Sequence, residues 1–189
     1  GWHGSLEVLD GSDITFNNLQ VGWGSEGFVI YPDATVEVAG DFHTNGPFVN
    51  CGSFTSQRFQ VNFSGSAINS GTIEVDKSMR LIGHMENHGL VTVYDDLTLN
   101  FSGELTNYCE IQVGDDFKVF RNVHNYAFIN VADYTAIYFT GRVNLYDGAM
   151  HRTGSSLIYG RYVGNGSQSL IKVLDNTIAY WNGRIDGNL

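Results

Sequence analysis

The chain has 189 residues, and its ten Lys and Arg against twenty Asp and Glu give a formal net charge of −10. Because proteins bind nucleic acid by neutralising phosphates with basic side chains, this charge excludes nucleic acid as an expected partner. Hydrophobic residues make up 42% of the chain, which is enough to bury a core and excludes general disorder. Membrane insertion is not expected, since no window holds the roughly 18 consecutive apolar residues of a membrane helix.

The N-terminal residues match no regular pattern, and we expect residues 1–27 to form a cap or an irregular coil. Residues 28–45 alternate apolar and polar side chains, which is typical of half-buried strands. In this segment Val36, Val38 and Phe42 are expected to point inward.

Further along the chain, four stretches repeat one pattern: residues 71–87, 89–107, 109–125 and 127–144. Each contains an apolar-x-Val pair, a turn with acidic residues, a second apolar pair, another turn, one apolar residue and then Asn. The period of two predicts short strands. Because such strands are too short to stand alone, we expect each to pair with its copies in the next repeat.

This repeat predicts the fold class. Coils stacked about 4.8 Å apart form an all-β, single parallel β-helix (β-solenoid) with about 19 residues and three short strands per coil. A right-handed wind is expected from the general handedness of parallel crossovers. We expect one domain over residues 1–189, with regular coils over 28–144 and irregular C-terminal coils or a cap over 145–189.

Three columns of inward side chains are expected, one for each strand of the coil. Each large aliphatic side chain contributes about 1.5–3 kcal/mol on burial, so the columns form one continuous core. The first column is Ile73/Val75, Val91/Val93, Ile111/Val113 and Ile129/Val131; the second is Met79/Leu81, Leu97/Leu99, Phe117/Val119 and Ile137/Phe139; the third is Met85, Leu105, Val123 and Val143.

An asparagine closes each repeat. Asparagine suits corners and stacked copies can hydrogen-bond one another, so we expect a ladder along Asn50, Asn69, Asn87, Asn107, Asn125 and Asn144. Cys51 and Cys109 lie beside this column about three coils apart, or about 14 Å along the axis. A disulfide needs Cα atoms within about 7 Å, so both thiols are predicted to be free.

Acidic residues recur in the first turn. Asp95, Asp115 and Asp133 are expected to share a column in which carboxylates lie about 5 Å apart, and a calcium ion could bind there. The simpler interpretation is a solvated turn, because Asp is a preferred turn residue. Alternatively, Asp95, Asp96, Asp115 or Asp116 could act as acid and base of a glycosidase, whose carboxyl groups lie about 5–9.5 Å apart. No cofactor other than calcium is expected.

Next to the asparagines, His88, Tyr108 and Tyr126 form a column of aromatic residues. Aromatic faces on a groove suit stacking against sugars, and Tyr adds a hydroxyl group. These residues are therefore candidates for ligand binding, although stacked aromatic rings also stabilise a corner without a ligand.

The run Pro32–Asn45 and the Asn-x-Gly-x-apolar-x-Val theme of residues 69–75 and 87–93 resemble the repeats of bacterial surface and secreted proteins of the adhesin type. Filamentous-haemagglutinin-like β-helices are similar in coil length. The resemblance covers residues 28–144 and carries no functional residue across. It implies an extracellular or cell-surface protein that attaches to a glycan or to a host or surface receptor.

These observations lead to three functional hypotheses. The first is a non-catalytic extracellular module for adhesion or carbohydrate binding. The second is a polysaccharide-degrading enzyme that uses the turn aspartates, and the third is a purely structural stalk. A solenoid shape alone does not distinguish them.

Overall fold

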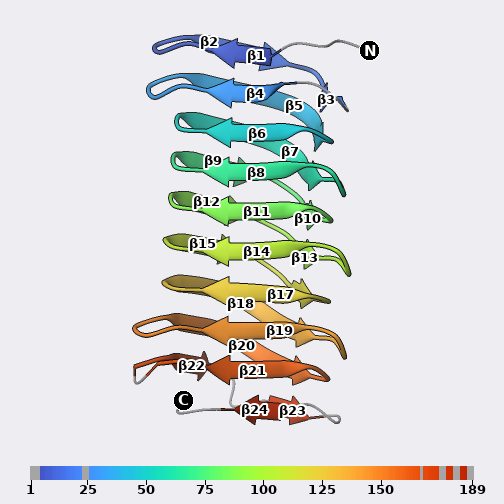
Figure 1. Cartoon of the computed structure of the whole chain (residues 1–189), viewed down its shortest axis with the longest axis vertical. Coiled ribbons are helices and arrows are strands. Elements are labelled where there is room, and N and C mark those ends of the chain that lie inside the picture. Colours follow the sequence, from blue (N-terminus) through green and yellow to red (C-terminus); the bar gives the residue numbers. More distant parts are fainter. Residues whose placement is uncertain (1–4, 23–25, 167, 175–177, 181–183, 187–189) are drawn as a thin grey trace.

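The computed structural model describes residues 5–22, 26–166, 168–174, 178–180 and 184–186. Within these residues every regular element is a strand, and the strands pair in parallel. The coils follow one another along the long axis of the molecule, from the N-terminal end to the C-terminal end (Figure 1). The predicted parallel β-solenoid is therefore confirmed.

The coils build two sheets, called here sheet A and sheet B. Sheet A has ten strands: β1 (Ser5–Val8), β4 (Gly27–Ile30), β6 (Pro47–Asn50), β8 (Ser66–Asn69), β11 (His84–Asn87), β14 (Glu104–Asn107), β17 (Asn122–Asn125), β19 (Arg142–Leu145), β21 (Arg161–Gly164) and β24 (Arg184–Asp186). Sheet B has fourteen: β2 (Asp13–Phe16), β3 (Leu19–Val21), β5 (Thr35–Thr44), β7 (Ser53–Val61), β9 (Thr72–Val75), β10 (Met79–Leu81), β12 (Leu90–Val93), β13 (Leu97–Leu99), β15 (Glu110–Val113), β16 (Phe117–Val119), β18 (Phe128–Ile137), β20 (Met150–Ile158), β22 (Leu170–Val173) and β23 (Ile178–Tyr180).

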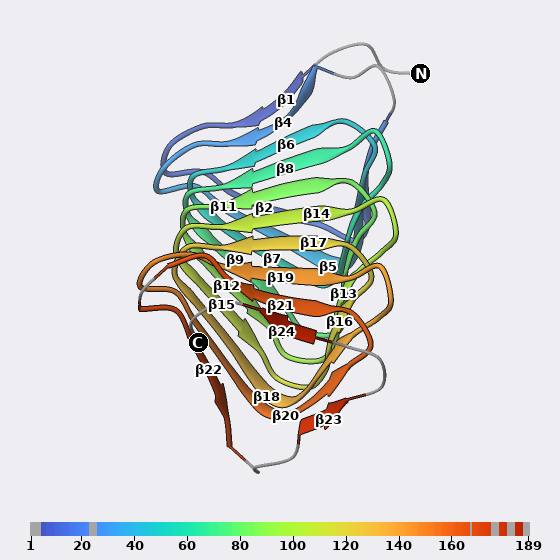
Figure 2. The same cartoon turned by 60° about the horizontal axis from the view of Figure 1, so that its bottom comes forward.

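Each coil has three sides, one in sheet A and two in sheet B (Figure 2). In the middle coils the two sheet B sides are separate strands, such as β12 and β13, as the sequence predicts. In four coils they join into one long bent strand, β5, β7, β18 or β20. The described parts of both end segments, expected as caps or irregular coils, contain β1–β3 and β20–β24, which pair in the same parallel manner.

The interior matches the predicted columns with one exception. Every predicted inward residue from Ile73 to Val143 is at most 2% exposed except Phe139, whose side chain is 70% exposed. In β18 the residues that pair with Phe117 and Val119 are Thr135 and Ile137, not Ile137 and Phe139. The inward residue at the start of this segment is thus a polar threonine, and the apolar pattern placed the segment two residues too far along.

Thr135 belongs to a small polar cluster inside the core. Its hydroxyl donates to Thr153 Oγ1 over 3.0 Å, and His151 Nε2 lies 3.1 Å from Thr135 Oγ1. Because that hydroxyl proton is already used, Nε2 carries the ring proton and donates to Thr135, while the buried Nδ1 has no hydrogen-bond partner. Burial in the core lowers the pKa of His151 from 6.5 to about 3, so the ring is neutral.

The asparagine ladder runs through the interior along five fully buried residues, Asn50, Asn69, Asn87, Asn107 and Asn125. The side-chain amide of each of the first four donates to the Oδ1 atom of the next asparagine over 2.8 Å. The same amide groups also donate to backbone carbonyls at the following turn, as Asn87 does to Gly89 and Glu110. Stacking of identical side chains thus satisfies polar groups that would be costly to bury alone.

Asn144 does not belong to this ladder, contrary to the sequence prediction. Leu145 pairs with Asn125 and takes the next position in the column, while Asn144 pairs with His124. The amide of Asn144 donates instead to the carbonyl of Val123 over 3.1 Å. At the other end of the ladder Ile30 pairs with Asn50. The ladder is thus flanked by an apolar residue at each end, Ile30 and Leu145.

Glycines after the ladder asparagines let the coils approach closely. A Cβ atom on Gly89 would lie 2.0 Å from the carbonyl oxygen of Gly71, and one on Gly71 would lie equally close to the carbonyl oxygen of Gly52. Further along the column Cys109 and Ala127 follow at the same place. Both cysteines of the chain are free thiols, as predicted from their separation.

We predict that Asn87→Ala destabilises the protein by about 2–4 kcal/mol, because it removes the buried bonds of Asn87 to Asn69 and Asn107 and its bonds to two backbone carbonyls. The matched control is Asn144→Ala, which removes one bond to a backbone carbonyl and is expected to cost about 1 kcal/mol. Urea unfolding of both variants gives the comparison. Equal losses would show that the ladder adds nothing beyond single hydrogen bonds.

A second prediction concerns acid. In the folded protein His151 has a pKa of about 3, whereas in the unfolded chain its pKa is the ordinary 6.5, so between these pH values only the unfolded chain carries the extra proton. The free energy of unfolding should therefore fall as pH drops from 6.5 towards 3, by about 1.4 kcal/mol per pH unit from this residue. His151→Leu should remove that slope, measured as the difference between variant and wild type in urea unfolding across this pH range. Parallel profiles would mean that the ring is protonated inside the fold.

Candidate functional site

Outward side chains gather at the corners of the coil. The acidic corner is the bend between the two sides of sheet B, at residues 76–78, 94–96, 114–116 and 132–134. The aromatic corner is the connection from sheet B to sheet A, at residues 45–46, 62–65, 82–83, 100–103, 120–121, 138–141 and 159–160. The ring stack lies at the third corner, next to the asparagine ladder, and contains His88, Tyr108, Tyr126 and Tyr146.

At the acidic corner the predicted aspartates do come together. Carboxylate oxygens of Asp95, Asp96 and Asp115 lie within 4.8 Å of one another, and so do those of Asp115, Asp116 and Asp133. Asp115 therefore links both groups, and the expected neighbours Asp95/Asp115 and Asp115/Asp133 are adjacent. Calcium binding at these residues stays a prediction, because the same arrangement occurs in solvated turns.

A lysine sits among these carboxylates. Lys118 Nζ lies 2.5 Å from Asp96 Oδ2 and 3.2 Å from Asp116 Oδ2. Partial burial disfavours the charged amine, but the hydrogen bonds to both carboxylates outweigh it and raise the pKa of Lys118. Lys118 thus places a cation of the protein itself among these carboxylates. The pKa of Asp115 is raised above its ordinary value. Loss of hydration is the largest cause, and the negative charges of Asp116 and the other aspartates come next.

The aromatic column predicted next to the ladder forms the ring stack. The ring of Tyr108 lies between those of His88 and Tyr126. The ring centroids are 4.7 Å apart for His88 and 4.8 Å apart for Tyr126, and the angles between the ring planes are 10° and 17°. Tyr126 in turn stacks on Tyr146 at 3.9 Å and 8°. The two ring faces of Tyr108 and of Tyr126 are thus covered by other rings, and only edges and hydroxyl groups face outward. Loss of hydration raises the pKa of Tyr146 to about 12, and the hydrogen bond with Tyr126 is the second cause of this shift.

The aromatic corner was missed by sequence reasoning. Its connections alternate in length along the solenoid: two residues at 45–46, four at 62–65, two at 82–83, four at 100–103, two at 120–121, four at 138–141 and two at 159–160. The four-residue connections read Asn-Phe-Ser-Gly, Asn-Phe-Ser-Gly and Tyr-Phe-Thr-Gly. The solenoid therefore repeats every two coils at this corner, and Phe63, Phe101 and Phe139 recur every 38 residues.

Each four-residue connection is held in one conformation. The glycine N–H donates to the first carbonyl of the turn over 2.7–2.9 Å, at Gly65, Gly103 and Gly141. The hydroxyl of the Ser or Thr donates to a carbonyl of the preceding coil: Ser64 to Asn45, Ser102 to Ile82 and Thr140 to Phe120. These bonds fix the turn and leave the phenylalanine at its tip.

The phenylalanines at these tips point into solvent. Phe63, Phe101 and Phe139 are 74%, 68% and 70% exposed. Between them the two-residue connections add further rings, and Phe120 stacks on Tyr138 at 4.0 Å and 3°. Phe101 contacts Phe120 and Phe139 contacts Tyr159, with ring centroids 4.9 and 5.2 Å apart. Because the rings in both pairs are tilted and not stacked, most of each exposed phenylalanine ring stays accessible. Exposed apolar patches of this kind mark interaction sites.

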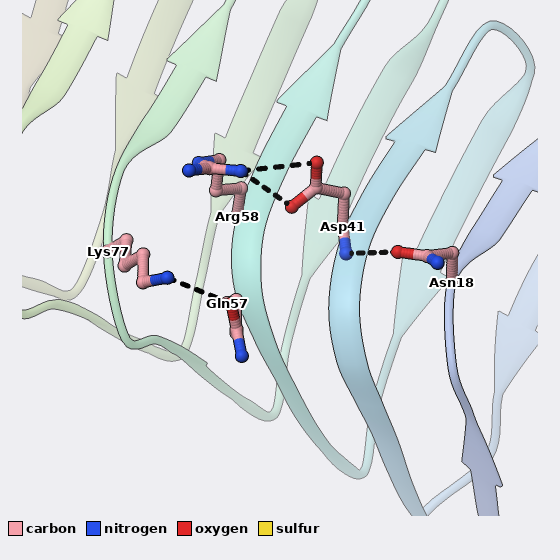
Figure 3. Close-up of polar contacts among 5 residues, drawn as sticks. All are labelled: Asn18, Asp41, Gln57, Arg58 and Lys77. Atoms are coloured by element: carbon pink, nitrogen blue, oxygen red, sulfur yellow. Dashed lines mark hydrogen bonds and ion pairs between the residues drawn. The ribbon is translucent and has the colours of Figure 1, made fainter.

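The early coils carry a different polar cluster, shown in Figure 3. Arg58 pairs with Asp41 at 3.2 Å, the backbone N–H of Asp41 donates to Asn18, and Lys77 donates to Gln57. Each contact joins neighbouring coils, so the cluster clamps the stack rather than converging on one point. A shallow depression nearby is lined by Asn18, Leu19, Gln20, Asp41 and His43, and it includes none of the predicted site residues.

Comparisons of the chain with models of protein families, with curated proteins and with solved structures found no match. In the part of the chain that the structure describes, no helix has the length and apolar character needed to cross a membrane. The architecture thus defines the class of the protein, a parallel β-solenoid.

The acidic corner yields a prediction. Asp116 is the strongest of the charges that raise the pKa of Asp115, so Asp116→Asn is expected to lower that pKa towards its ordinary value of 3.8. Asp95→Asn, which removes the weakest of these charges, is the control and should change it less. Titration of the side-chain carboxyl carbons by NMR measures both. An unchanged pKa in both variants would exclude charge repulsion as a cause.

Proposed function

We propose that this protein is a non-catalytic, extracellular carbohydrate-binding module that serves adhesion. The single observation that carries the proposal is the row of exposed phenylalanines, Phe63, Phe101 and Phe139, on alternate coils of one corner. Exposing an apolar ring to water costs free energy, and fixed turns hold each phenylalanine there with most of its ring uncovered by the rest of the molecule. Binding to a ligand with an apolar face would bury these rings.

A sugar ring offers such a face together with hydroxyl groups at its edge. Stacking on an aromatic ring buries the apolar face, and neighbouring amides and hydroxyls can bind the edge. The tips of the aromatic corner suit this contact better than the ring stack does, because the faces of Tyr108 and Tyr126 are already covered. His88, Tyr108 and Tyr126 remain candidates for contacts through edges and hydroxyl groups.

The alternative function is polysaccharide cleavage by the acidic corner. It is favoured by the short separations among Asp95, Asp96 and Asp115 and by the raised pKa of Asp115, because a glycosidase needs a protonated and an ionised carboxyl group close together. Lys118 already pairs with Asp96 and Asp116, however, so two of the four candidate carboxylates are engaged in ion pairs within the molecule. We therefore place binding ahead of catalysis.

The proposal predicts that the wild-type protein co-sediments with insoluble polysaccharides or is retarded in gels that contain soluble ones. The triple variant Phe63→Ala/Phe101→Ala/Phe139→Ala should bind at least about tenfold more weakly, because the stacking faces are gone. Its thermal unfolding should stay close to that of wild type, since the three rings lie outside the core.

The matched control is Tyr94→Ala, which removes a 57% exposed ring from the acidic corner and should leave binding unchanged. Equal binding by the triple variant and wild type would overturn the proposal. The same incubations, assayed for new reducing ends, should give no product. Product that disappears with Asp115→Asn would establish the enzymatic alternative instead.

A further inference from the structure

Charge is divided between the corners of the solenoid. The seven connections of the aromatic corner, from 45–46 to 159–160, contain no Asp or Glu, although the chain has twenty of them. The acidic corner holds Asp76, Asp95, Asp96, Asp115, Asp116 and Asp133. Glu104, the one acid directly flanking the aromatic connections, lies beside His84 at 3.7 Å and His124 at 3.4 Å.

Arginines accompany the exposed rings. Arg121 lies in the connection between the Phe101 and Phe139 turns, and Arg142 directly follows the Phe139 turn. The two residues are neighbours across coils, because the N–H of Arg142 donates to the carbonyl of Arg121 over 2.9 Å. Both side chains are exposed, and neither forms an ion pair with a carboxylate among the described residues.

A third arginine approaches the corner from sheet B. Arg80 is exposed two residues before the connection at 82–83. When the side-chain amide of Asn100 is oriented with its oxygen towards Arg80, that oxygen accepts hydrogen bonds from Arg80 Nε over 2.9 Å and from a terminal guanidinium nitrogen over 2.7 Å. Arg80 too has no carboxylate partner among the described residues. A protein with a net charge of −10 thus keeps unpaired cations beside its exposed aromatic rings.

The spacing of the rings adds a geometric requirement. Coils rise about 4.8 Å, so phenylalanines on alternate coils are about 10 Å apart along the axis. In an extended β-1,4-linked polysaccharide each sugar is turned over relative to the last, so every second sugar presents the same face. The length of such a two-sugar unit is close to two coils. One extended chain parallel to the solenoid axis can therefore stack a sugar on each phenylalanine in turn.

Resting on the proposed carbohydrate-binding function, we infer that the ligand is an extended, β-1,4-linked polyuronate that lies along the aromatic corner. Alternate sugars stack on Phe63, Phe101 and Phe139, and their neighbours present carboxylates to Arg80, Arg121 and Arg142. Guanidinium groups bind carboxylates through two parallel hydrogen bonds, which gives the site its preference for acidic over neutral sugars.

The test uses oligomers of equal length from three polymers: β-1,4-linked mannuronate, neutral β-1,4-linked mannose, and α-1,4-linked galacturonate. Calorimetric titration should show that the mannuronate oligomer binds at least about tenfold more tightly than the neutral one, since the two differ only at C6, where a carboxylate replaces the hydroxymethyl group. The bent galacturonate oligomer should bind more weakly than mannuronate because it cannot stay in register with the rings. Raising NaCl from about 0.05 M to about 0.5 M should remove the advantage of mannuronate by screening exposed charges.

Arg121→Gln/Arg142→Gln should remove most of the advantage of mannuronate over neutral mannose, with Arg80 left to supply the remainder, and should leave mannose binding unchanged. Arg58→Gln, which removes an arginine paired with Asp41 away from this corner, is the control and should have no effect. Equal binding of mannose and mannuronate, both lost in the phenylalanine variant, would overturn the inference and leave the proposed function standing. Absence of phenylalanine-dependent binding to any of the three would overturn both.

Discussion

Parallel backbone pairing between successive coils fixes where the side chains of this protein lie. Along sheet A the register continues from strand to strand, so each position is repeated as a column in the next coil. A polar side chain can then be buried if its copies satisfy it, as the ladder from Asn50 to Asn125 shows. Outside the core, the same rule stacks Tyr108 between its aromatic neighbours and brings carboxylates of successive coils together at one corner.

Much of the fold could be predicted from the sequence, because alternation of apolar and polar residues reports directly on which side of a strand is buried. It failed where burial was not apolar. Thr135 faces inward because Thr153 and His151 satisfy its hydroxyl, and a pattern of apolar residues therefore assigned Phe139 to the core. Asn144 was assigned to the ladder by residue type, whereas pairing places Leu145 there.

The candidate site was less accessible to prediction. Spacing alone brought His88, Tyr108 and Tyr126 into one column, but which parts of the rings stay open depends on side-chain rotamers that spacing does not specify. The row of exposed phenylalanines did have a sequence signal, the 38-residue recurrence of Phe-Ser/Thr-Gly. A comparison of single coils hides it, because the intervening connections are two residues shorter.

The alternation of long and short connections also bears on how such a chain can lengthen during evolution. The hydroxyls of Ser64, Ser102 and Thr140 each reach the carbonyl that opens a short connection on the preceding coil. Gene duplication of a single coil would place two connections of equal length next to each other, and the second would meet a turn unlike the one that it meets now. Duplication of a 38-residue pair preserves every junction, which makes the coil pair the natural unit of inheritance in this molecule.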